Sequence, residues 1–197
     1  MNHFIVDIHT HSASPDVVSP RERGVHPWCA EEIDIEGVDW ERLTHDAEAI
    51  GEIGLDYARV FDRQKQQQLF ETQLYVAEQK RLPVVIHCVK AFESTLATLR
   101  KYNLRAVIFH GFIGSAQQAR QLLDRGFYLS FGERTARSPK SIVALKMIPL
   151  DRLFVESDES STPIYNIYEE IAALRGCTAE QLIASARDNY NKIFKIR

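Results

Sequence analysis

Short runs of apolar, often β-branched residues alternate along the chain with longer segments in which apolar residues recur every three or four positions. The short runs predict seven strands, the second of them weakly, at residues 3–9, 23–28, 49–55, 82–88, 105–111, 126–132 and 152–158. The longer segments predict helices at residues 62–81, 91–102, 115–126, 139–148, 163–175 and 179–195.

Local start and stop signals support several of these helices. Ser115 with Gln118, and Thr178 with Gln181, have the spacing of a capping box, in which a hydroxyl and an amide side chain satisfy each other's backbone N–H groups. Gly126 and Gly176 stand where helices are expected to end, because glycine adopts the left-handed backbone without strain.

Near-continuous apolar strands that alternate with helices are typical of a parallel sheet covered on both faces. The fold class is therefore predicted to be α/β. Seven strands favour a TIM-like (β/α) barrel that is incomplete, with one unit missing, and a doubly wound open sheet is the alternative. A chain of 197 residues fits a single domain spanning residues 1–197.

Charge and cysteine content narrow the functional classes. The formal net charge of −3 excludes the overall basic surface of a non-specific nucleic-acid binder, although a local positive groove remains open. The three cysteines form no CxxC pair, which suits a reducing compartment. Neither a signal-like apolar core nor a run of ~18 apolar residues is found, so we expect a cytoplasmic protein without a membrane partner.

The stretch DIHTHSA (residues 7–13) follows the first apolar run. In a strand, alternate residues face the same way, so Asp7, His9 and His11 are expected on one side. Two imidazoles buried on one face without partners are unfavourable. They need a hydrogen-bond network, an open cleft or a metal ion.

Similar side chains follow the other predicted strands. The ends of parallel strands meet at one rim, where α/β proteins bind their ligands. Six residues of types that commonly bind metals are therefore predicted to converge there: His9, His11, Glu52, His87, His110 and Asp158. Each histidine alone could be a core residue, and each carboxylate alone a helix cap. Their joint placement favours a metal site.

Residues of a substrate-binding surface are expected at the same rim. His26 lies at the end of the weak second strand, and Lys90 follows the fourth. Gly114 and Ser115 precede a helix, where free N–H groups and the helix dipole favour a phosphate. Turn-forming glycines and solvated loop charges are the structural alternatives. Cys88 is expected to point away from His87, which excludes a Cys–His nucleophilic pair.

The aromatic side chains of Trp28, Tyr57 and Phe112 are also expected near this rim. Such rings could stack on nucleic-acid bases, as they do in proteins that bind single strands. Core packing is the alternative for each of them. Arg134 and Arg137 follow a later strand and could neutralise a phosphate, or they could be solvated loop charges.

In order, the motifs DIHTH, GVHPW, GEIGLDY, VVIHC, IFHGFIG and IPLDRLFVESD resemble the TatD family of metal-dependent hydrolases in the amidohydrolase superfamily. The resemblance runs through nearly the whole chain and implies a (β/α)-barrel deoxyribonuclease with two divalent metal ions. By motif, His9, His11 and Asp158 would hold one ion, His87 and His110 the other, and Glu52 would bridge them.

In this resemblance Glu52 and Asp158 are the catalytic residues, with Asp158 placed to accept a proton from the attacking water. A metal pair lowers the pKa of water and clamps the oxygens of a phosphodiester. Imidazole and carboxylate ligands suit Zn, Mn or Fe, and the resemblance implies Mg or Mn, so the expected ions are Mg, Mn or Zn and the ligand types do not select one.

The sequence also departs from the family pattern on the substrate side. Between HTH and GVHP the chain has only SASPDVVSPRER, where the family has a further helix–strand–helix unit. Val89 replaces a common arginine, and Trp28 replaces the second histidine of HPH. A missing unit exposes backbone edges that a loop or a second subunit must cover, which leaves a homodimer open.

The predicted function is metal-dependent hydrolysis of phosphodiester bonds in DNA. One alternative is hydrolysis of a small ester, amide or phosphoester by the same metal pair. The other is a metal-binding interaction protein whose catalytic surface has decayed. Turnover distinguishes this last alternative from the two enzymes.

Overall fold

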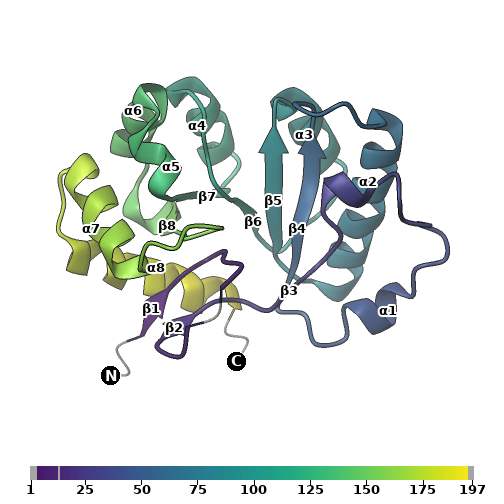
Figure 1. Cartoon of the computed structure of the whole chain (residues 1–197), viewed down its shortest axis with the longest axis horizontal. Helices are drawn as coiled ribbons and strands as arrows, with labels where there is room; N and C mark the ends of the chain where they lie inside the picture. Colours follow the sequence, from purple (N-terminus) through teal and green to yellow (C-terminus); the bar gives the residue numbers. More distant parts are fainter. Residues whose placement is uncertain (1–3, 13, 195–197) are drawn as a thin grey trace. The chain divides into compact units, whose positions relative to one another are not determined.

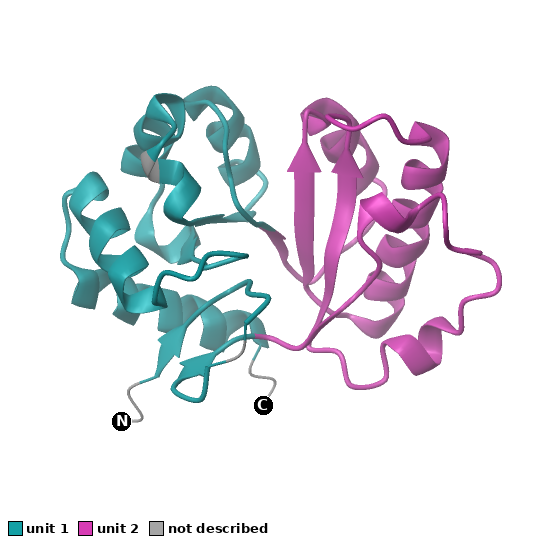
Figure 2. Cartoon of the chain, viewed as in Figure 1, with its two compact units in different colours: residues 1–19, 109–197 teal, residues 20–108 magenta. Residues whose placement is uncertain are grey.

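The computed structural model describes residues 4–12 and 14–194. The chain forms two compact units, which Figure 2 shows in different colours. Unit 1 contains residues 1–19 and 109–197, and unit 2 contains residues 20–108. Unit 2 is therefore continuous in sequence, whereas unit 1 is assembled from the two ends of the chain. The single domain stays a prediction.

The described residues form eight strands, whose labels appear in Figure 1. They are β1 (Ile5–Val6), β2 (Val17–Val18), β3 (Glu22–Arg23), β4 (Ala49–Asp56), β5 (Val84–Val89), β6 (Val107–Phe109), β7 (Tyr128–Phe131) and β8 (Leu153–Val155). One sheet pairs β1 with β2, and the other has the strand order β3-β4-β5-β6-β7-β8. In the described residues these are separate ladders rather than one closed barrel. The predicted α/β class is confirmed, and so are six of the seven predicted strands. The weak strand predicted at residues 23–28 overlaps β3 only at Arg23, because Pro27 and Trp28 lie in a 3-10 turn, and β2 is an additional strand.

The six predicted helices are also confirmed as α2, α3, α4, α6, α7 and α8. Their bounds are α2 (Arg63–Lys80), α3 (Phe92–Leu99), α4 (Ala116–Leu123), α6 (Pro139–Met147), α7 (Ile164–Arg175) and α8 (Ala179–Phe194). Sequence periodicity misses α1 (Trp40–Leu43), α5 (Glu133–Ala136) and the 3-10 turns η1 (Pro27–Cys29) and η2 (Leu150–Arg152), because none of them is longer than four residues. The predicted limits at residues 3 and 195 lie outside the described residues.

Three of the four helix signals act as predicted, whereas Gly126 lies two residues beyond Asp124, the C-cap of α4, with a φ of 76°. Ser115 Oγ accepts a hydrogen bond from Gln118 N, and Gln118 Oε1 accepts one from Ser115 N. Thr178 and Gln181 make the same reciprocal pair. Gly176 ends α7 with a φ of 83°. Among the described residues no helix has both the length and the apolar character needed to span a bilayer.

In unit 1 the segment after β1 runs parallel to the segment after β8. Ile8 N donates to Val155 O at 3.2 Å, and Asp158 N donates to His9 O at 3.0 Å. The side chain of Ile8 is fully buried in the core. Helix α7 fixes the same segment through the buried Tyr168 hydroxyl, which donates to Val6 O at 2.8 Å. These contacts hold the N-terminal segment, which has only a two-residue strand of its own, beside the chain after β8.

In unit 2, β4 pairs in parallel with β3 and β5, and α2 and α3 pack against them (Figure 1). Two buried glutamines on one face of α2 complete the backbone hydrogen bonds of neighbouring segments. Gln66 accepts from Asp56 N and donates to Asp56 O, and Gln73 does the same for Val25. Helix α2 therefore positions the end of β4 and the segment before η1.

Replacement of Gln66 by leucine tests this role. Q66L keeps the size of the side chain but leaves two buried backbone groups of Asp56 without these partners, so we expect a loss of about 2–4 kcal/mol in the free energy of unfolding. Urea denaturation followed by circular dichroism measures it. The exposed Gln68 of the same helix provides the control Q68L, and equal effects of the two substitutions would contradict the assigned role of Gln66.

Candidate metal centre

The first cluster of ligand-type side chains lies in unit 1, where the chain after β1 meets the chain after β8. His11 Nε2 lies 3.6 Å and His9 Nε2 lies 4.0 Å from Asp158 Oδ1. The His9 side chain is 5% exposed and that of His11 54%. Asp158 has a φ of 53°, and its carbonyl accepts from His11 N at 3.1 Å. The backbone pairing therefore brings these three predicted ligands together.

Asp7 shares the alternation of His9 and His11 but has a structural partner. Its carboxylate accepts hydrogen bonds from the backbone N and the Oγ of Ser157, at 2.9 and 2.5 Å. Burial raises the pKa of Asp7 to about 6, although the bonds from Ser157 partly oppose this. Asp7 therefore anchors the segment that carries Asp158.

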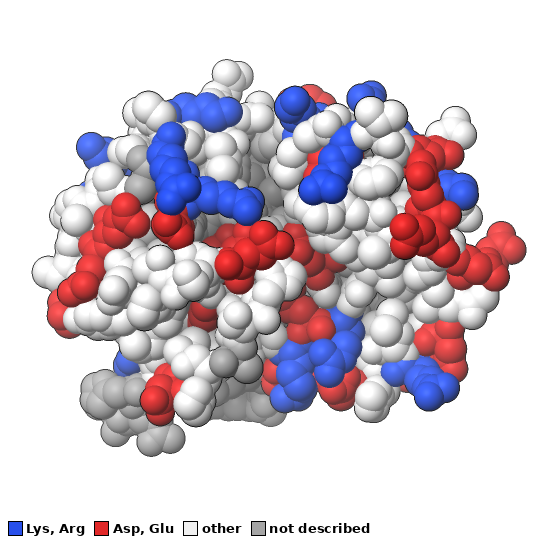
Figure 3. All heavy atoms as spheres, in the orientation of Figure 1, with Lys and Arg blue, Asp and Glu red and all other residues white. Residues whose placement is uncertain are grey.

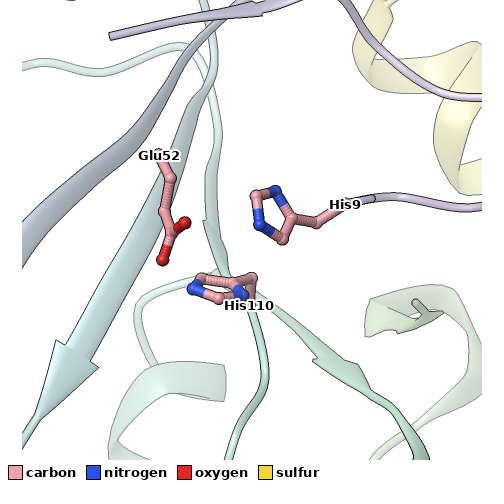
Figure 4. Close-up of side chains that lie close together, drawn as sticks. All are labelled: His9, Glu52 and His110. Atoms are coloured by element: carbon pink, nitrogen blue, oxygen red, sulfur yellow. The ribbon is translucent and has the colours of Figure 1, made fainter. Parts of the chain in front are cut away.

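His110, at the end of β6, extends the unit 1 cluster. Its ring centroid lies 4.4 Å from that of His9, and Figure 4 shows the two rings. His110 Nδ1 lies 3.6 Å from Glu156 Oε1, and the other oxygen of Glu156 accepts from Ser130 Oγ. Burial alone would raise the pKa of Glu156, but the interactions with His110, His9 and Ser130 bring it below the ordinary value.

The second cluster lies in unit 2 and consists of His26, Glu52 and His87. Strands β4 and β5 carry Glu52 and His87, and His26 directly precedes η1. His87 Nδ1 lies 2.5 Å from Glu52 Oε1, and His26 Nε2 lies 3.4 Å from both atoms. The three side chains are 10–23% exposed. The structure thus places His26, predicted as a substrate contact, beside two predicted metal ligands.

The second ring nitrogen of His87, Nε2, lies next to a buried carboxylate. Asp56 Oδ2 lies 3.3 Å from His87 Nε2 and accepts from Trp28 Nε1 at 2.8 Å. Burial alone would raise the pKa of Asp56, but the hydrogen bonds from Trp28, a backbone amide and His87 outweigh burial and lower it.

The donor atoms in each unit suit a divalent metal ion. The three groups contained within one unit have one donor atom per residue, all within 4.8 Å of one another: His9–His11–Asp158, His110–Glu156–Asp158 and His26–Glu52–His87. Imidazole nitrogen and carboxylate oxygen are the ligands that zinc, manganese and iron sites use. The residues therefore fit divalent metal ions, and the division of the ligands between two ions stays a prediction.

The predicted substrate residues have different surroundings. Lys90 is exposed after β5. Gly114 is buried, and a Cβ there would collide with the Phe112 ring. The Ser115 hydroxyl is occupied by the capping box of α4. Arg134 reaches toward the first cluster, with Nη1 3.9 Å from Asp158 Oδ2. Phosphate binding by Lys90, Gly114 and Ser115 stays a prediction.

Of the three predicted rim aromatics, Trp28 is exposed and Phe112 is packed in the core of unit 1. The Arg59 guanidinium lies 3.5 Å from the centroid of Trp28, and that of Arg63 lies 4.4 Å from the centroid of Tyr57. Trp28 and Tyr57 therefore each carry a positive charge on one face.

Two residues of the clusters, Glu156 and Asp56, were missed in the sequence. A usable signal existed for Glu156, because it lies two residues before Asp158 and so shares its side in an extended strand. Asp56 lies inside the motif GEIGLDY, four residues after Glu52, and has the same alternation. Each carboxylate lies next to a ring nitrogen of a predicted ligand: Glu156 next to His110 and Asp56 next to His87.

Comparison with known proteins decides the family. The family model described as "TatD related DNase" matches residues 9–195. The chain belongs to the TatD family. This confirms the family suggested by the sequence motifs, and with it the class of metal-dependent hydrolases.

Two similar proteins are named as a metal-dependent hydrolase and as an exonuclease. The uncharacterized metal-dependent hydrolase YabD of Bacillus subtilis is 34% identical over 198 residues, covering 88% of this chain and 76% of its own length. The 3'-5' ssDNA/RNA exonuclease TatD of Citrobacter rodentium is 32% identical over 173 residues, covering 75% and 65%. Both alignments cover most of this chain.

Solved structures confirm the fold. The TatD homologue YJJV of Escherichia coli superimposes with a TM-score of 0.79 at 22% identity, covering 99% of this chain and 87% of its own. A TatD-family hydrolase of Entamoeba histolytica gives a TM-score of 0.76 at 20% identity, covering 91% and 75%. The TatD-family chain therefore has the TIM-barrel type of fold predicted from its strands.

The raised pKa of Asp7 predicts a pH dependence of stability. The folded state holds a proton on Asp7 up to about pH 6, whereas the unfolded state releases it near 3.8. The contribution of Asp7 to the free energy of unfolding is therefore largest below about pH 4. It falls by roughly 2–3 kcal/mol as the pH rises from about 4 to above 6.

Denaturant unfolding of metal-free protein at pH 4.5 and 7 tests this expectation. D7N should lose less stability than the wild type between these pH values. D16N, which removes an exposed carboxylate of the same unit, controls for the change in net charge. An identical pH dependence in wild type and D7N would show that Asp7 does not titrate in this range.

Proposed function

We propose that this TatD-family hydrolase uses two divalent metal ions to cleave phosphodiester bonds in single-stranded DNA. The observation that carries the proposal is that all six ligand-type residues predicted from the strand ends belong to compact groups of metal-binding geometry. The family membership and the exonuclease name of one relative support the same chemistry.

In this proposal the residues that would hold the ions are those that the family resemblance implies: His9, His11, Glu52, His87, His110 and Asp158. Divalent ions such as Mg, Mn or Zn, when bound there, would lower the pKa of water and neutralise charge on the phosphate. Asp158 accepts the proton of the attacking water, because its carboxylate is partly exposed next to His11. His26 lies next to Glu52 and contacts the substrate.

The substrate side favours a narrow ligand. Basic side chains are interspersed with acidic ones on the face drawn in Figure 3, without a broad basic area. The exposed Arg59–Trp28 stack lies beside His26, with the Trp28 and His26 rings 4.6 Å apart. A single strand, with its unpaired bases and one phosphate chain, fits such a surface better than a duplex does. The mixed charge also suits a small phosphoester, which is the second candidate.

Cleavage of a labelled single-stranded oligonucleotide by metal-stripped protein tests the proposed function. Mg²⁺, Mn²⁺ or Zn²⁺ added separately should restore shortening from one end. E52Q should lower the rate on the order of 100-fold or more, because even residues behind metal ligands contribute 10–100-fold. E36Q, at an exposed glutamate of unit 2, is the control.

Wild-type protein that binds these ions but leaves the oligonucleotide intact would contradict the nuclease assignment. Cleavage of p-nitrophenyl phosphoesters by the same preparation would then support the small-substrate alternative. Absence of both activities, with metal binding that E52Q weakens, would support the non-enzymatic alternative.

Arg59 provides a separate test of the substrate side. R59A should raise KM for the oligonucleotide by ~3- to 10-fold and leave kcat nearly unchanged, since an exposed charge contributes a modest, salt-dependent attraction. Steady-state kinetics at low and high salt measures the effect. K65A, at an exposed lysine of α2, is the control, and an unchanged KM in R59A would remove Arg59 from the substrate surface.

A further inference from the structure

Asp56 lies at the end of β4 and is 3% exposed. Three N–H groups face its two carboxylate oxygens. Trp28 Nε1 donates to Oδ2 at 2.8 Å, His87 Nε2 lies 3.3 Å from the same oxygen, and Ala58 N donates to Oδ1 at 2.9 Å. A buried carboxylate surrounded in this way is both satisfied and oriented.

The backbone of Asp56 is fixed as well. Gln66 of α2 accepts from Asp56 N at 2.9 Å and donates to Asp56 O at 3.1 Å. Neither the main chain nor the carboxylate can therefore turn away from His87 without breaking buried hydrogen bonds. Asp56 is a fixed point against which the imidazole ring is oriented.

The two nitrogens of His87 have different partners. Nε2 lies against Asp56, whereas Nδ1 faces Glu52 Oε1 at 2.5 Å and His26 Nε2 at 3.4 Å. An ionised carboxylate only accepts hydrogen bonds, so Nε2 must carry a proton to bond Asp56. The nitrogen directed at the ligand cluster is then Nδ1.

We propose that Asp56 is the positioning residue of the unit 2 cluster, holding the His87 ring so that Nδ1 is presented to the metal ion, and that the Trp28 indole holds Asp56. The inference rests on the proposed metal centre. Histidines that bind metals commonly donate their second N–H to a carboxylate, and loss of that carboxylate weakens metal binding.

The Trp28 side chain extends from the buried Asp56 carboxylate to the protein surface. Its N–H points inward to Asp56, while its ring is 36% exposed and carries Arg59. A histidine at this position would also offer an N–H donor. The donor to Asp56, rather than the indole ring itself, is therefore the property that the metal cluster requires.

Isothermal titration of metal-stripped full-length protein with Zn²⁺ tests the inference. D56N cannot accept all three N–H groups, because its amide places donors where one oxygen was, so its affinity should fall about 10- to 100-fold. W28F removes only the indole N–H and should lower the Zn²⁺ affinity by a smaller factor than D56N does. W28H keeps an N–H donor at this position and should bind Zn²⁺ about as tightly as the wild type. D62N, at the exposed helix cap of α2, should bind as the wild type does.

Nitrogen-15 spectra of histidine-labelled, metal-free protein add a readout that does not depend on activity. The wild type should show a protected Nε2–H proton on His87, and D56A should lose it. D56N with wild-type Zn²⁺ affinity, or an unchanged Nε2–H signal in D56A, would overturn the positioning role. Protein that binds Zn²⁺ in a D56-dependent manner but cleaves no oligonucleotide overturns the nuclease proposal alone. Failure of the wild type to bind Zn²⁺ would overturn both.

Discussion

Parallel backbone pairing between the chain after β1 and the chain after β8 sets the geometry of unit 1. Asp158 donates its N–H to the carbonyl of His9 and accepts from the N–H of His11. The three side chains are therefore spaced by main-chain hydrogen bonds, which are stronger constraints than side-chain contacts alone. In unit 2 the pairing of β4 with β5 acts in the same way and aligns Gly54 with His87, two residues after Glu52.

Both units support a histidine with a buried carboxylate. Glu156 lies behind His110 and is itself held by Ser130, and Asp56 lies behind His87 and is held by Trp28. A buried charge is tolerated only where several donors face it, so these carboxylates also fix the surrounding backbone. In each unit, therefore, one buried carboxylate both orients a ligand-type histidine and holds the backbone near a strand end in place.

The strand ends were predictable because apolar runs mark the strands and alternation assigns the sides, which was sufficient for His9, His11, His87 and His110. The supporting carboxylates were missed because a charged residue at a strand end resembles an exposed rim residue. Gln66 and Gln73 were hidden in a polar helix, where the sequence gives no sign that two glutamines are buried. The short β2, α1 and α5 depend on long-range contacts rather than on local pattern.

The discontinuity of unit 1 has a consequence for how the protein is made. Residues 4–12 are synthesised well before most of their hydrogen-bonding partners, which include residues 155–158, Tyr168 and Arg187. Unit 2, by contrast, is complete once residue 108 has emerged. During synthesis, His9, His11 and their apolar neighbour Ile8 can acquire these backbone partners only after residues 155–158 have been added. The last helices therefore complete the N-terminal metal-ligand motif as well as the C-terminal part of the fold.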